Sequence, residues 1–264
     1  MVDMLATTGS IYDQFNLSSR TALITGGSKG IGKSIARAFA TAGANVVITS
    51  RNQAELDASL RDILEGTEVK GFSLVADHAD WKNADRVADK VLEMAGHIDI
   101  LVNNAGTGLV KPLEDMTNDE LTYIMSLNLL NPIALCRAFL DGMIDKKWGR
   151  IINMSSLFGV IGKELRTAYC ASKGGLLSFT RAFAVELAPF GITVNALGAG
   201  PIKTSLTEGS WNDPLISTQF KKMVPLGRWG EPDEMAGAAV LLASEAGSYI
   251  TGQIILVDGG ASIQ

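Results

Sequence analysis

The chain has 264 residues, of which 47% are hydrophobic and 19% are charged. This balance supports a large apolar core and excludes an intrinsically disordered chain. The formal net charge of −5 argues against a nucleic-acid partner, because phosphate binding requires clustered Lys and Arg. The 2 cysteines lack Cys-x-x-Cys spacing and the 2 histidines lack a metal-type partner, so we expect reduced thiols and no metal site.

The N-terminal segment Met1–Phe15 has neither a basic region nor a long apolar run, so it does not resemble a signal peptide. No uninterrupted apolar stretch reaches the roughly 18 residues that a membrane span requires. We therefore expect a cytoplasmic protein that does not enter a membrane.

Short β-branched runs alternate with longer helical patterns along the chain. This alternation is typical of βαβ units, whose strands form a parallel sheet with helices on both faces. Consecutive apolar residues, as in Val46–Ile48, indicate strands that are buried on both faces. The predicted strands are Thr21–Thr25, Asn45–Thr49, Lys70–Val75, Ile98–Val102, Arg150–Asn153, Thr193–Ala196 and Ile254–Val257, and the predicted helices are Ile31–Thr41, Gln53–Leu64, Trp81–Ala95, Asn118–Lys146, Thr167–Ala188 and Pro232–Ala243.

The chain contains no linker rich in Pro, Gly and Ser and no internal repeat. We therefore predict one α/β domain over residues 20–264, built on a doubly wound parallel sheet of about seven strands. Residues 1–19 are expected to form an N-terminal tail. Residues 203–224 interrupt the alternation with Gly209, Trp211 and Pro214, and this irregular insertion predicts a substrate loop.

A glycine-rich turn, Thr25–Gly32, joins the first predicted strand to the first predicted helix. Glycines let a pyrophosphate approach backbone N–H groups, and the N-terminus of a helix attracts phosphate. An ordinary glycine-rich turn is the alternative, but the position between strand and helix is the context that a dinucleotide site requires. The candidate cofactor-binding residues in this turn are Gly26, Ser28, Lys29, Gly30, Ile31 and Gly32.

The end of the second predicted strand indicates the type of dinucleotide. An Asp or Glu there would bind the ribose 2′-hydroxyl of NAD, but the chain has Ser50, Arg51 and Asn52, with Lys29 in the preceding turn. Cations favour the 2′-phosphate of NADP, because Arg and Lys form charge-assisted hydrogen bonds with phosphate oxygens. The alternative is that Arg51 is only a surface residue. We predict NADP(H) as the cofactor, with Ser50 and Arg51 among its contacts.

Tyr169 and Lys173 lie four positions apart within a predicted helix, so their side chains share one face. A tyrosine pKa of about 10 is too high for proton transfer at neutral pH. We expect the Lys173 ammonium to favour the phenolate and so to lower the pKa of Tyr169. Such a pair is suited to proton exchange with a carbonyl or an alcohol, although Tyr-x-x-x-Lys alone also occurs by chance.

The complete set of motifs resembles the short-chain dehydrogenase/reductase family. The resemblance extends from about Leu17 to the segment Val257–Gly260, and Ser156 precedes Tyr169 at the family's usual spacing. It implies a single Rossmann-fold domain and oxidoreductase activity on CH–OH groups. The motifs that carry it are Thr25-Gly-x-x-x-Gly30-x-Gly32, Asn103-Asn104-Ala105-Gly106, Asn128, Ser156, Tyr169 and Lys173.

The resemblance assigns a catalytic role to four residues. It implies that Tyr169 exchanges the proton, and that Lys173 lowers the pKa of Tyr169 and binds the nicotinamide ribose. Ser156 is expected to hold the substrate oxygen, and Asn128 to anchor a water molecule of a proton relay. It also implies further cofactor contacts at Asp77 for the adenine, at Asn104, Ala105 and Gly106 for the adenosine half, and at Gly200, Ile202 and Thr204 around the carboxamide.

Pro132 follows Asn128 by one helical turn. Proline has no N–H, so a helix through this segment cannot form the hydrogen bond from residue 132 to the Asn128 carbonyl. We expect the helix to be distorted here, and the freed carbonyl is a candidate to hold the relay water.

Within the family, the sequence is most similar to gluconate 5-dehydrogenases and 3-oxoacyl carrier-protein reductases. Gly162-Lys163-Glu164 and Gly227-Arg228-Trp229-Gly230 favour the first group. Arg166 is a candidate partner for a substrate carboxylate, and the alternative is that its charge faces solvent or a neighbouring subunit. The alternatives are an apolar pocket for acyl or cyclic ketones, and a non-catalytic dinucleotide-binding protein. The apolar pocket would comprise Leu157, Phe158, Val160 and Trp211.

The resemblance also implies assembly into a homotetramer through long helices and the C-terminal segment. Apolar positions in Ile133–Phe139 and Leu176–Leu187 are candidates for such a surface, and core packing explains them equally well.

Overall fold

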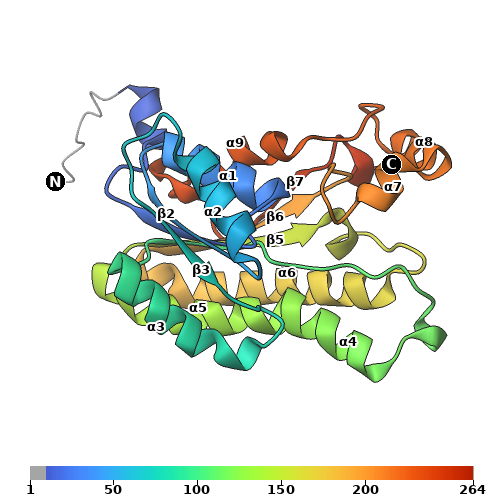
Figure 1. The fold of residues 1–264 in the computed structure, drawn as a ribbon, viewed down its shortest axis with the longest axis horizontal. Coiled ribbons are helices and arrows are strands. Elements are labelled where there is room, and N and C mark those ends of the chain that lie inside the picture. The colour runs from blue at the N-terminus through green and yellow to red at the C-terminus, as the bar shows by residue number, and fades with distance from the viewer. Residues whose placement is uncertain (1–9, 264) are drawn as a thin grey trace.

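A computed structural model describes residues 10–263, which form a parallel sheet between two layers of helices (Figure 1). The sheet has seven strands in the order β3-β2-β1-β4-β5-β6-β7, and every neighbouring pair is parallel. This confirms the predicted doubly wound Rossmann fold. The strands are β1 (Thr21–Thr25), β2 (Asn45–Ser50), β3 (Gly71–Val75), β4 (Ile100–Asn103), β5 (Gly149–Ser156), β6 (Ile192–Ala199) and β7 (Ile254–Val257).

Helices cover both faces of the sheet (Figure 1). One face carries α1 (Gly30–Thr41), α2 (Gln53–Leu64) and α9 (Ala236–Ala243). The other carries α3 (Ala84–Ala95), α5 (Asn131–Lys146) and α6 (Thr167–Leu187). The remaining helices are α4 (Asn118–Met125), α7 (Glu208–Asn212) and α8 (Pro214–Met223).

Consecutive apolar residues in the central strands fill two separate cores. Ile24 packs on the face that includes Phe39 of α1, whereas its neighbour Leu23 packs on the face that includes Phe139 of α5. Ile24 and Leu23 are both 0% exposed, and each such burial contributes about 2 kcal/mol to folding. The absence of alternation in the strand sequences therefore reflects helices on both faces.

β5 and β6 extend three residues beyond the predicted ends, to Ser156 and Ala199. Ser155 and Gly198 are paired and buried there, but small residues do not show the β-branched pattern of a strand. The extension brings Ser156 to the carboxyl edge of the sheet. This edge, where the strand order reverses between β1 and β4, is the place where doubly wound sheets bind ligands.

The predicted helix Asn118–Lys146 consists of α4, a π-helical segment Ser126–Leu130 and α5. The Asn131 N–H bonds to the carbonyl of Ser126, five residues back, so the helix is distorted where Pro132 led us to expect it. This stretch is long and apolar enough to cross a membrane by length and composition alone. It is 56% buried over its apolar window and packs against α3 and α6, as a core helix does.

The segment 203–224 was predicted to be irregular, but it contains the helices α7 and α8. The Asp213 carboxylate accepts hydrogen bonds from the N–H groups of Leu215 and Ile216, and so caps α8. At the other end of the chain, residues 1–9 of the predicted tail lie outside the described residues. Leu17 is buried in the core, and its N–H donates to the carbonyl of Ala42, so contact with the domain begins before residue 20.

Candidate active site

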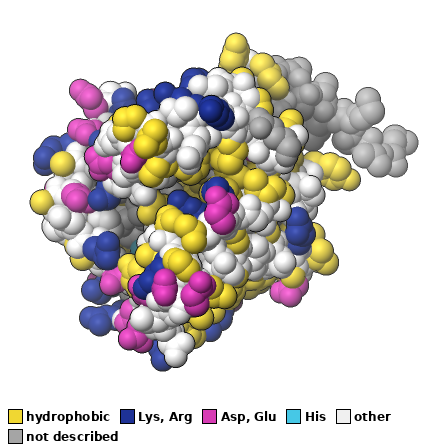
Figure 2. Space-filling model, turned by 90° about the vertical axis from the view of Figure 1, so that its right-hand side faces the viewer, with side chains coloured by type: hydrophobic (Ala, Val, Ile, Leu, Met, Phe, Trp, Pro, Cys, Tyr) yellow, Lys and Arg dark blue, Asp and Glu magenta, His cyan; other side chains and the backbone are white. Residues whose placement is uncertain are grey.

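A cleft of about 690 Å³ lies at the carboxyl edge of the sheet. Figure 2 looks onto this side of the molecule and shows a hollow bordered by basic and apolar side chains. The cleft extends from the turn after β1 to the first turn of α6. Most of the predicted cofactor-binding residues line it, namely Gly26, Ser28, Lys29, Gly30, Ile31, Gly32, Ser50, Arg51, Asp77, Asn104, Ala105, Gly106, Tyr169, Lys173 and Thr204.

The turn after β1 is shaped by glycines. Gly26 and Gly30 have φ of 66° and 55°, which favour glycine. A Cβ on Gly32 would lie 2.4 Å from the carbonyl oxygen of Gly26, so no larger residue fits there. α1 begins at Gly30, and the side chain of Lys29 does not cap its first N–H groups. Free N–H donors on an uncapped helix and an open backbone turn fit a dinucleotide pyrophosphate.

Asn104 holds this turn in place. Its side-chain amide donates to the carbonyls of Thr25 and Gly26 at 2.8 and 3.2 Å. The Thr25 hydroxyl accepts hydrogen bonds from the N–H groups of Asn104 and Ala105. The structure therefore gives Asn104 a positioning role in addition to its place on the cleft wall.

The turn after β1 and the end of β2 carry the two positive charges expected for NADP, and α2 adds a negative charge that was not expected. Arg51 is exposed, and both Arg51 and Lys29 line the cleft. Glu55, in the first turn of α2, places its Oε2 3.6 Å from the Lys29 Nζ and 3.4 Å from the Ser28 Oγ. Sequence reasoning missed Glu55, although Asn52-x-x-Glu55 is a typical helix start that turns residue 55 back toward the strand end.

Beyond β3, Asp77 lines the cleft and accepts a hydrogen bond from the N–H of Ala79. The next residue, His78, was not predicted to line the cleft, and it is buried. Its Nε2 lies 2.7 Å from the Thr49 Oγ1 and its Nδ1 lies 3.4 Å from the Asn131 Oδ1. Burial lowers the pKa of His78 to about 4, so the imidazole is neutral near neutral pH.

Three of the four predicted catalytic side chains come from β5 and α6. Ser156 ends β5, and its hydroxyl accepts a hydrogen bond from the N–H of Phe158 at 3.1 Å. Tyr169 and Lys173 share one face of α6, and the Lys173 Nζ lies 5.9 Å from the centre of the Tyr169 ring. The Lys173 Nζ donates to the Met154 carbonyl at 2.8 Å. β5 therefore positions Ser156, and α6 positions Tyr169 and Lys173.

The fourth predicted catalytic residue, Asn128, lies in the π-helical segment and is 0% exposed. Its side chain accepts a hydrogen bond from the N–H of Thr107 and donates to the carbonyl of the same residue, each at 2.9 Å. It also donates to the Ser172 Oγ at 3.1 Å. A Cβ on Gly106 would lie 3.2 Å from the Asn128 Oδ1 and 3.4 Å from the Lys173 Nζ, so these polar groups meet around Gly106.

The expected effect of Lys173 on Tyr169 was wrong for this structure. Burial raises the pKa of Tyr169, and the Ser156 hydroxyl and the Arg166 guanidinium only partly oppose that rise. The Lys173 ammonium interacts with the Met154 carbonyl, and its own pKa falls to about 8 because it is buried. Desolvation outweighs charge attraction here, which a spacing pattern cannot show.

Arg166 lies beside Tyr169. Its guanidinium carbon is 6.0 Å from the centre of the Tyr169 ring and 5.7 Å from that of Phe158. Lys163 and Glu164 pair with one another, and no carboxylate pairs with Arg166 among residues 10–263. The apolar pocket considered from the sequence is not formed by Leu157 and Phe158, because both are buried in the core and neither lines the cleft.

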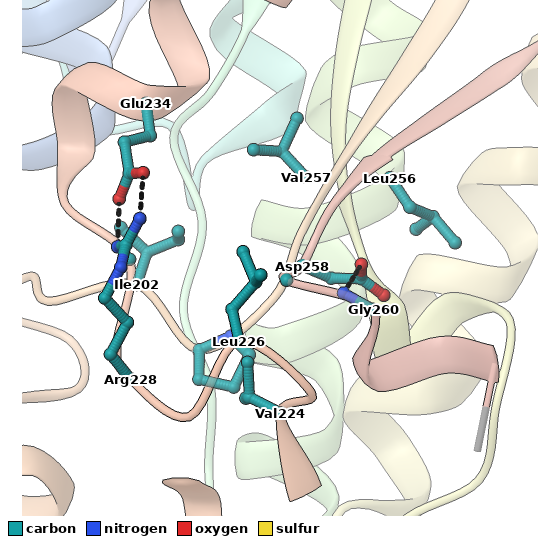
Figure 3. Close-up of a pocket in the computed structure, with 12 residues that line it drawn as sticks. Ile202, Val224, Leu226, Arg228, Glu234, Leu256, Val257, Asp258 and Gly260 are labelled. Atoms are coloured by element: carbon teal, nitrogen blue, oxygen red, sulfur yellow. Dashed lines mark hydrogen bonds and ion pairs between the residues drawn. The ribbon is translucent and has the colours of Figure 1, made fainter.

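Two predicted carboxamide contacts do not line the cleft. A Cβ on Gly200 would lie 2.4 Å from the Asp258 Cα, so this glycine allows close approach of the C-terminal segment. Ile202 forms a parallel bridge with Gly230, which directs it into a second pocket of about 480 Å³ (Figure 3). Figure 3 shows the two hydrogen bonds between Arg228 and Glu234 at the border of that pocket.

The remaining cleft residues were not singled out from the sequence. They lie in the last residues of β5 and β6, in loops after the strands, or in α4 and its π-helical extension, so only the folded arrangement identifies them. They are Ala76, Thr107, Tyr123, Leu127, Met154, Ser155, Ala199, Ser205 and Leu206, and Asn52, noted at the end of β2 from the sequence, also lines the cleft. Within residues 10–263, no group of three or more His, Cys, Asp or Glu side chains is arranged to hold a metal ion.

A doubly wound sheet with a glycine turn at its switch point and a Ser-Tyr-Lys group at the same edge defines a dinucleotide-dependent oxidoreductase. A family model described as enoyl-(acyl carrier protein) reductase matches residues 26–262. The chain belongs to the short-chain dehydrogenase/reductase family, and it is an oxidoreductase that acts on CH–OH groups.

Relatives of known activity cover nearly the whole chain. The chain is 34% identical to 3-oxoacyl-[acyl-carrier-protein] reductase of Aquifex aeolicus, over 94% of this chain and 99% of the relative. It is 36% identical to 2-dehydro-3-deoxy-D-gluconate 5-dehydrogenase of Bacillus subtilis, over 96% and 98%.

Solved structures show the same fold. A gluconate 5-dehydrogenase from Burkholderia cenocepacia, in complex with NADP and tartrate, is 35% identical with a TM-score of 0.91, over 97% of this chain and 100% of that one. A 3-oxoacyl (acyl-carrier-protein) reductase from Agrobacterium tumefaciens, with NADP bound, is 29% identical with a TM-score of 0.90, over 97% and 99%. The fold is therefore shared between two substrate classes.

Proposed function

We propose that this protein is an NADP(H)-dependent oxidoreductase that interconverts a ketone and a secondary alcohol on a sugar acid or polyol, as gluconate 5-dehydrogenases do. The observation that carries the substrate class is the Arg166 guanidinium, which lies beside Tyr169 with no carboxylate partner among residues 10–263. A guanidinium of this kind suits a carboxylate, to which it donates two parallel hydrogen bonds. The tartrate in the Burkholderia cenocepacia structure, a polyhydroxy acid, supports this class.

The side chains around Tyr169 provide the acid–base chemistry, and a bound nicotinamide supplies or accepts the hydride. In reduction the Tyr169 hydroxyl donates a proton to the carbonyl oxygen, and in oxidation the phenolate accepts it. Ser156, at the end of β5, donates a hydrogen bond to the same oxygen and holds it near Tyr169. The phenolic proton is thereby delivered to one defined atom.

Lys173 and Asn128 support that exchange. Lys173 is buried 5.9 Å from the Tyr169 ring, and its ammonium is available to a ribose hydroxyl and to the phenolate when it forms. Asn128 fixes the Thr107 backbone next to Lys173, and its own carbonyl lies before Pro132, which offers it no N–H. We assign this carbonyl the relay water that returns a proton to Lys173.

The cations in the turn after β1 and at the end of β2 support NADP(H) over NAD(H). Lys29 and Arg51 are placed to neutralise a 2′-phosphate, and no Asp or Glu ends β2. Several similar structures hold NADP, which agrees with this assignment.

Reduction of 3-oxoacyl thioesters is a second candidate. Leu206 lines the cleft and is 56% exposed, and Leu215 of α8 is 78% exposed, so apolar surface is present beside the site. NADP+ reduction by sugar acids and polyols, together with NADPH oxidation by keto sugar acids, 3-oxoacyl thioesters, diketones and steroids, separates the candidates. A sugar acid or polyol should have the highest kcat/KM. Turnover of thioesters alone would support the second candidate, and NADPH binding without turnover of any carbonyl would indicate a non-catalytic dinucleotide-binding protein.

Arg166→Gln tests the residue that defines the substrate class. Loss of a charged hydrogen-bond donor should weaken transition-state binding of acids by about 2 kcal/mol, which lowers kcat/KM for acids roughly 30-fold. The kcat/KM for neutral polyols should stay nearly unchanged. Lys163→Gln is the matched control, because that cation is already paired with Glu164. An equal effect of Arg166→Gln on acidic and neutral substrates would remove the argument for a sugar acid.

We further propose a cytoplasmic homotetramer. The apolar positions considered for its surface are largely used in the core, since Leu135, Phe139, Leu176 and Leu187 are buried within one chain. What remains on α6 is Val185, which is 78% exposed, together with Phe179 and Phe183, which stack on one another and are only partly buried against the core. Sedimentation at micromolar concentration should show a species near four times 28.0 kDa, and a monomer alone would contradict the proposal.

A further inference from the structure

Glu55 lies among the groups that we assign to the 2′-phosphate. Its Oε2 is 3.6 Å from the Lys29 Nζ and 3.4 Å from the Ser28 Oγ, and all three residues line the cleft. The side chains of Lys29 and Glu55 are 60% and 44% exposed, so the ion pair is accessible to a ligand and can open by rotation of two flexible side chains.

The Glu55 carboxylate favours a ribose with a free 2′-hydroxyl over a ribose that carries a 2′-phosphate. A 2′-phosphate carries between one and two negative charges, and it must compete with Glu55 for Lys29 while being repelled by Glu55. A 2′-hydroxyl has no charge and can donate a hydrogen bond to the same carboxylate. Arg51 acts in the opposite direction, because its exposed guanidinium attracts the phosphate.

We infer that Glu55 is a cofactor-selecting residue, which binds Lys29 in competition with the 2′-phosphate and so allows the protein to bind NAD(H) as well as NADP(H). The inference rests on the proposed NADP(H) cleft and adds a second, opposing determinant to it. The type of cofactor was predicted from the residues at the end of β2. That prediction did not include Glu55, because this side chain reaches the site from α2.

The test uses ligands that occupy only the adenosine half, namely adenosine 2′,5′-bisphosphate and 5′-AMP, together with NADPH and NADH. Dissociation constants are measured by calorimetry for the wild type and for Glu55→Gln, which keeps the shape and removes the charge. Glu55→Gln should bind the two 2′-phosphate ligands about fivefold more tightly than the wild type does. Its dissociation constants for 5′-AMP and NADH should not decrease. The matched control is Asp57→Asn, on the same helix and bonded only to the Gln53 side chain.

A double-mutant cycle with Lys29→Met shows whether Glu55 acts through Lys29. The gain from Glu55→Gln should shrink to less than about twofold in the Lys29→Met background. Equal gains for phosphorylated and unphosphorylated ligands, a gain that Asp57→Asn reproduces, or a gain that persists without Lys29 would each overturn the inference. Failure of the wild type to bind any of the four ligands would instead contradict the proposed function itself.

Discussion

The two ends of the cleft differ in how firmly their side chains are held. At the catalytic end Lys173 lines the cleft, whereas Asn128 and Ser156 do not; the three residues are 5%, 0% and 5% exposed, and each has a hydrogen bond with the backbone. At the adenosine end the side chains of Lys29 and Glu55 are about half exposed and pair with other side chains rather than with the backbone. One cleft therefore joins a rigid site, to which we assign the chemistry, to an adjustable site, to which we assign the choice of cofactor.

This difference has an energetic reason. Proton transfer requires fixed geometry, and buried hydrogen bonds to backbone atoms supply it at the cost of desolvating a lysine and a tyrosine. Choice between two cofactors requires only a small difference in binding free energy, which exposed charges provide. Substitutions at the catalytic end should therefore change rates strongly, whereas those at the adenosine end should change affinities moderately.

The largest effect is expected for Tyr169→Phe. It keeps the ring in place and removes the proton, so kcat should fall by about 10²–10⁴-fold while the dissociation constant of NADPH changes less than about twofold. Steady-state kinetics and calorimetry check the two parts. Tyr249→Phe, at a fully exposed tyrosine outside the cleft, is the control. A Tyr169→Phe variant with near-normal turnover would show that another group supplies the proton.

His78 is a buried residue at the adenosine end of the cleft, and it should make the free energy of unfolding depend on pH. Its pKa is about 4 in the folded protein and about 6.5 when unfolded, so its contribution is complete above about pH 6.5 and is lost as pH falls toward 4. Between about pH 7 and pH 5 this loss is about 2 kcal/mol. His78→Gln should flatten the dependence by that amount, as measured by urea unfolding at both pH values. An unchanged slope would mean that the imidazole is solvated in the folded state.

A smaller change in selectivity is expected for Arg51→Asp. The substitution replaces an attractive cation by a carboxylate that repels the 2′-phosphate and accepts from a ribose hydroxyl, so the preference for NADPH over NADH should be erased or reversed. The ratio of kcat/KM for the two cofactors should shift by about tenfold or more. Arg61→Ala, in the last turn of α2, is a control outside the cleft. Equal efficiency of the wild type with both cofactors would already contradict the assignment.

The sequence predicted the fold well because strand burial and glycine placement are local signals. Val46–Ile48 lies in β2 as expected, and the turn after β1 has the backbone that its glycines require. Three features depended on tertiary structure. Glu55 enters the site from α2, burial raises the pKa of Tyr169, and the Ile202–Gly230 bridge directs Ile202 into another pocket. Propensity and spacing carry no information on desolvation or on contacts between distant segments.

The smallest effect is expected for Pro132→Ala, which tests how rigid the catalytic end must be. Alanine restores the N–H that proline lacks, so the Asn128 carbonyl gains an intrahelical partner and the segment Ser126–Leu130 is drawn toward regular α-helix. Stability should change by less than about 1 kcal/mol, because Pro132 is near the start of α5, where proline is tolerated. Turnover should fall several-fold, roughly 3- to 10-fold, with little change in cofactor affinity, because the carbonyl assigned to the relay water is occupied and Asn128 shifts against Thr107. Thermal unfolding and kinetics measure both quantities. A variant that keeps full turnover would show that the Asn128 carbonyl is not needed for proton return and that the distortion at Pro132 serves packing alone.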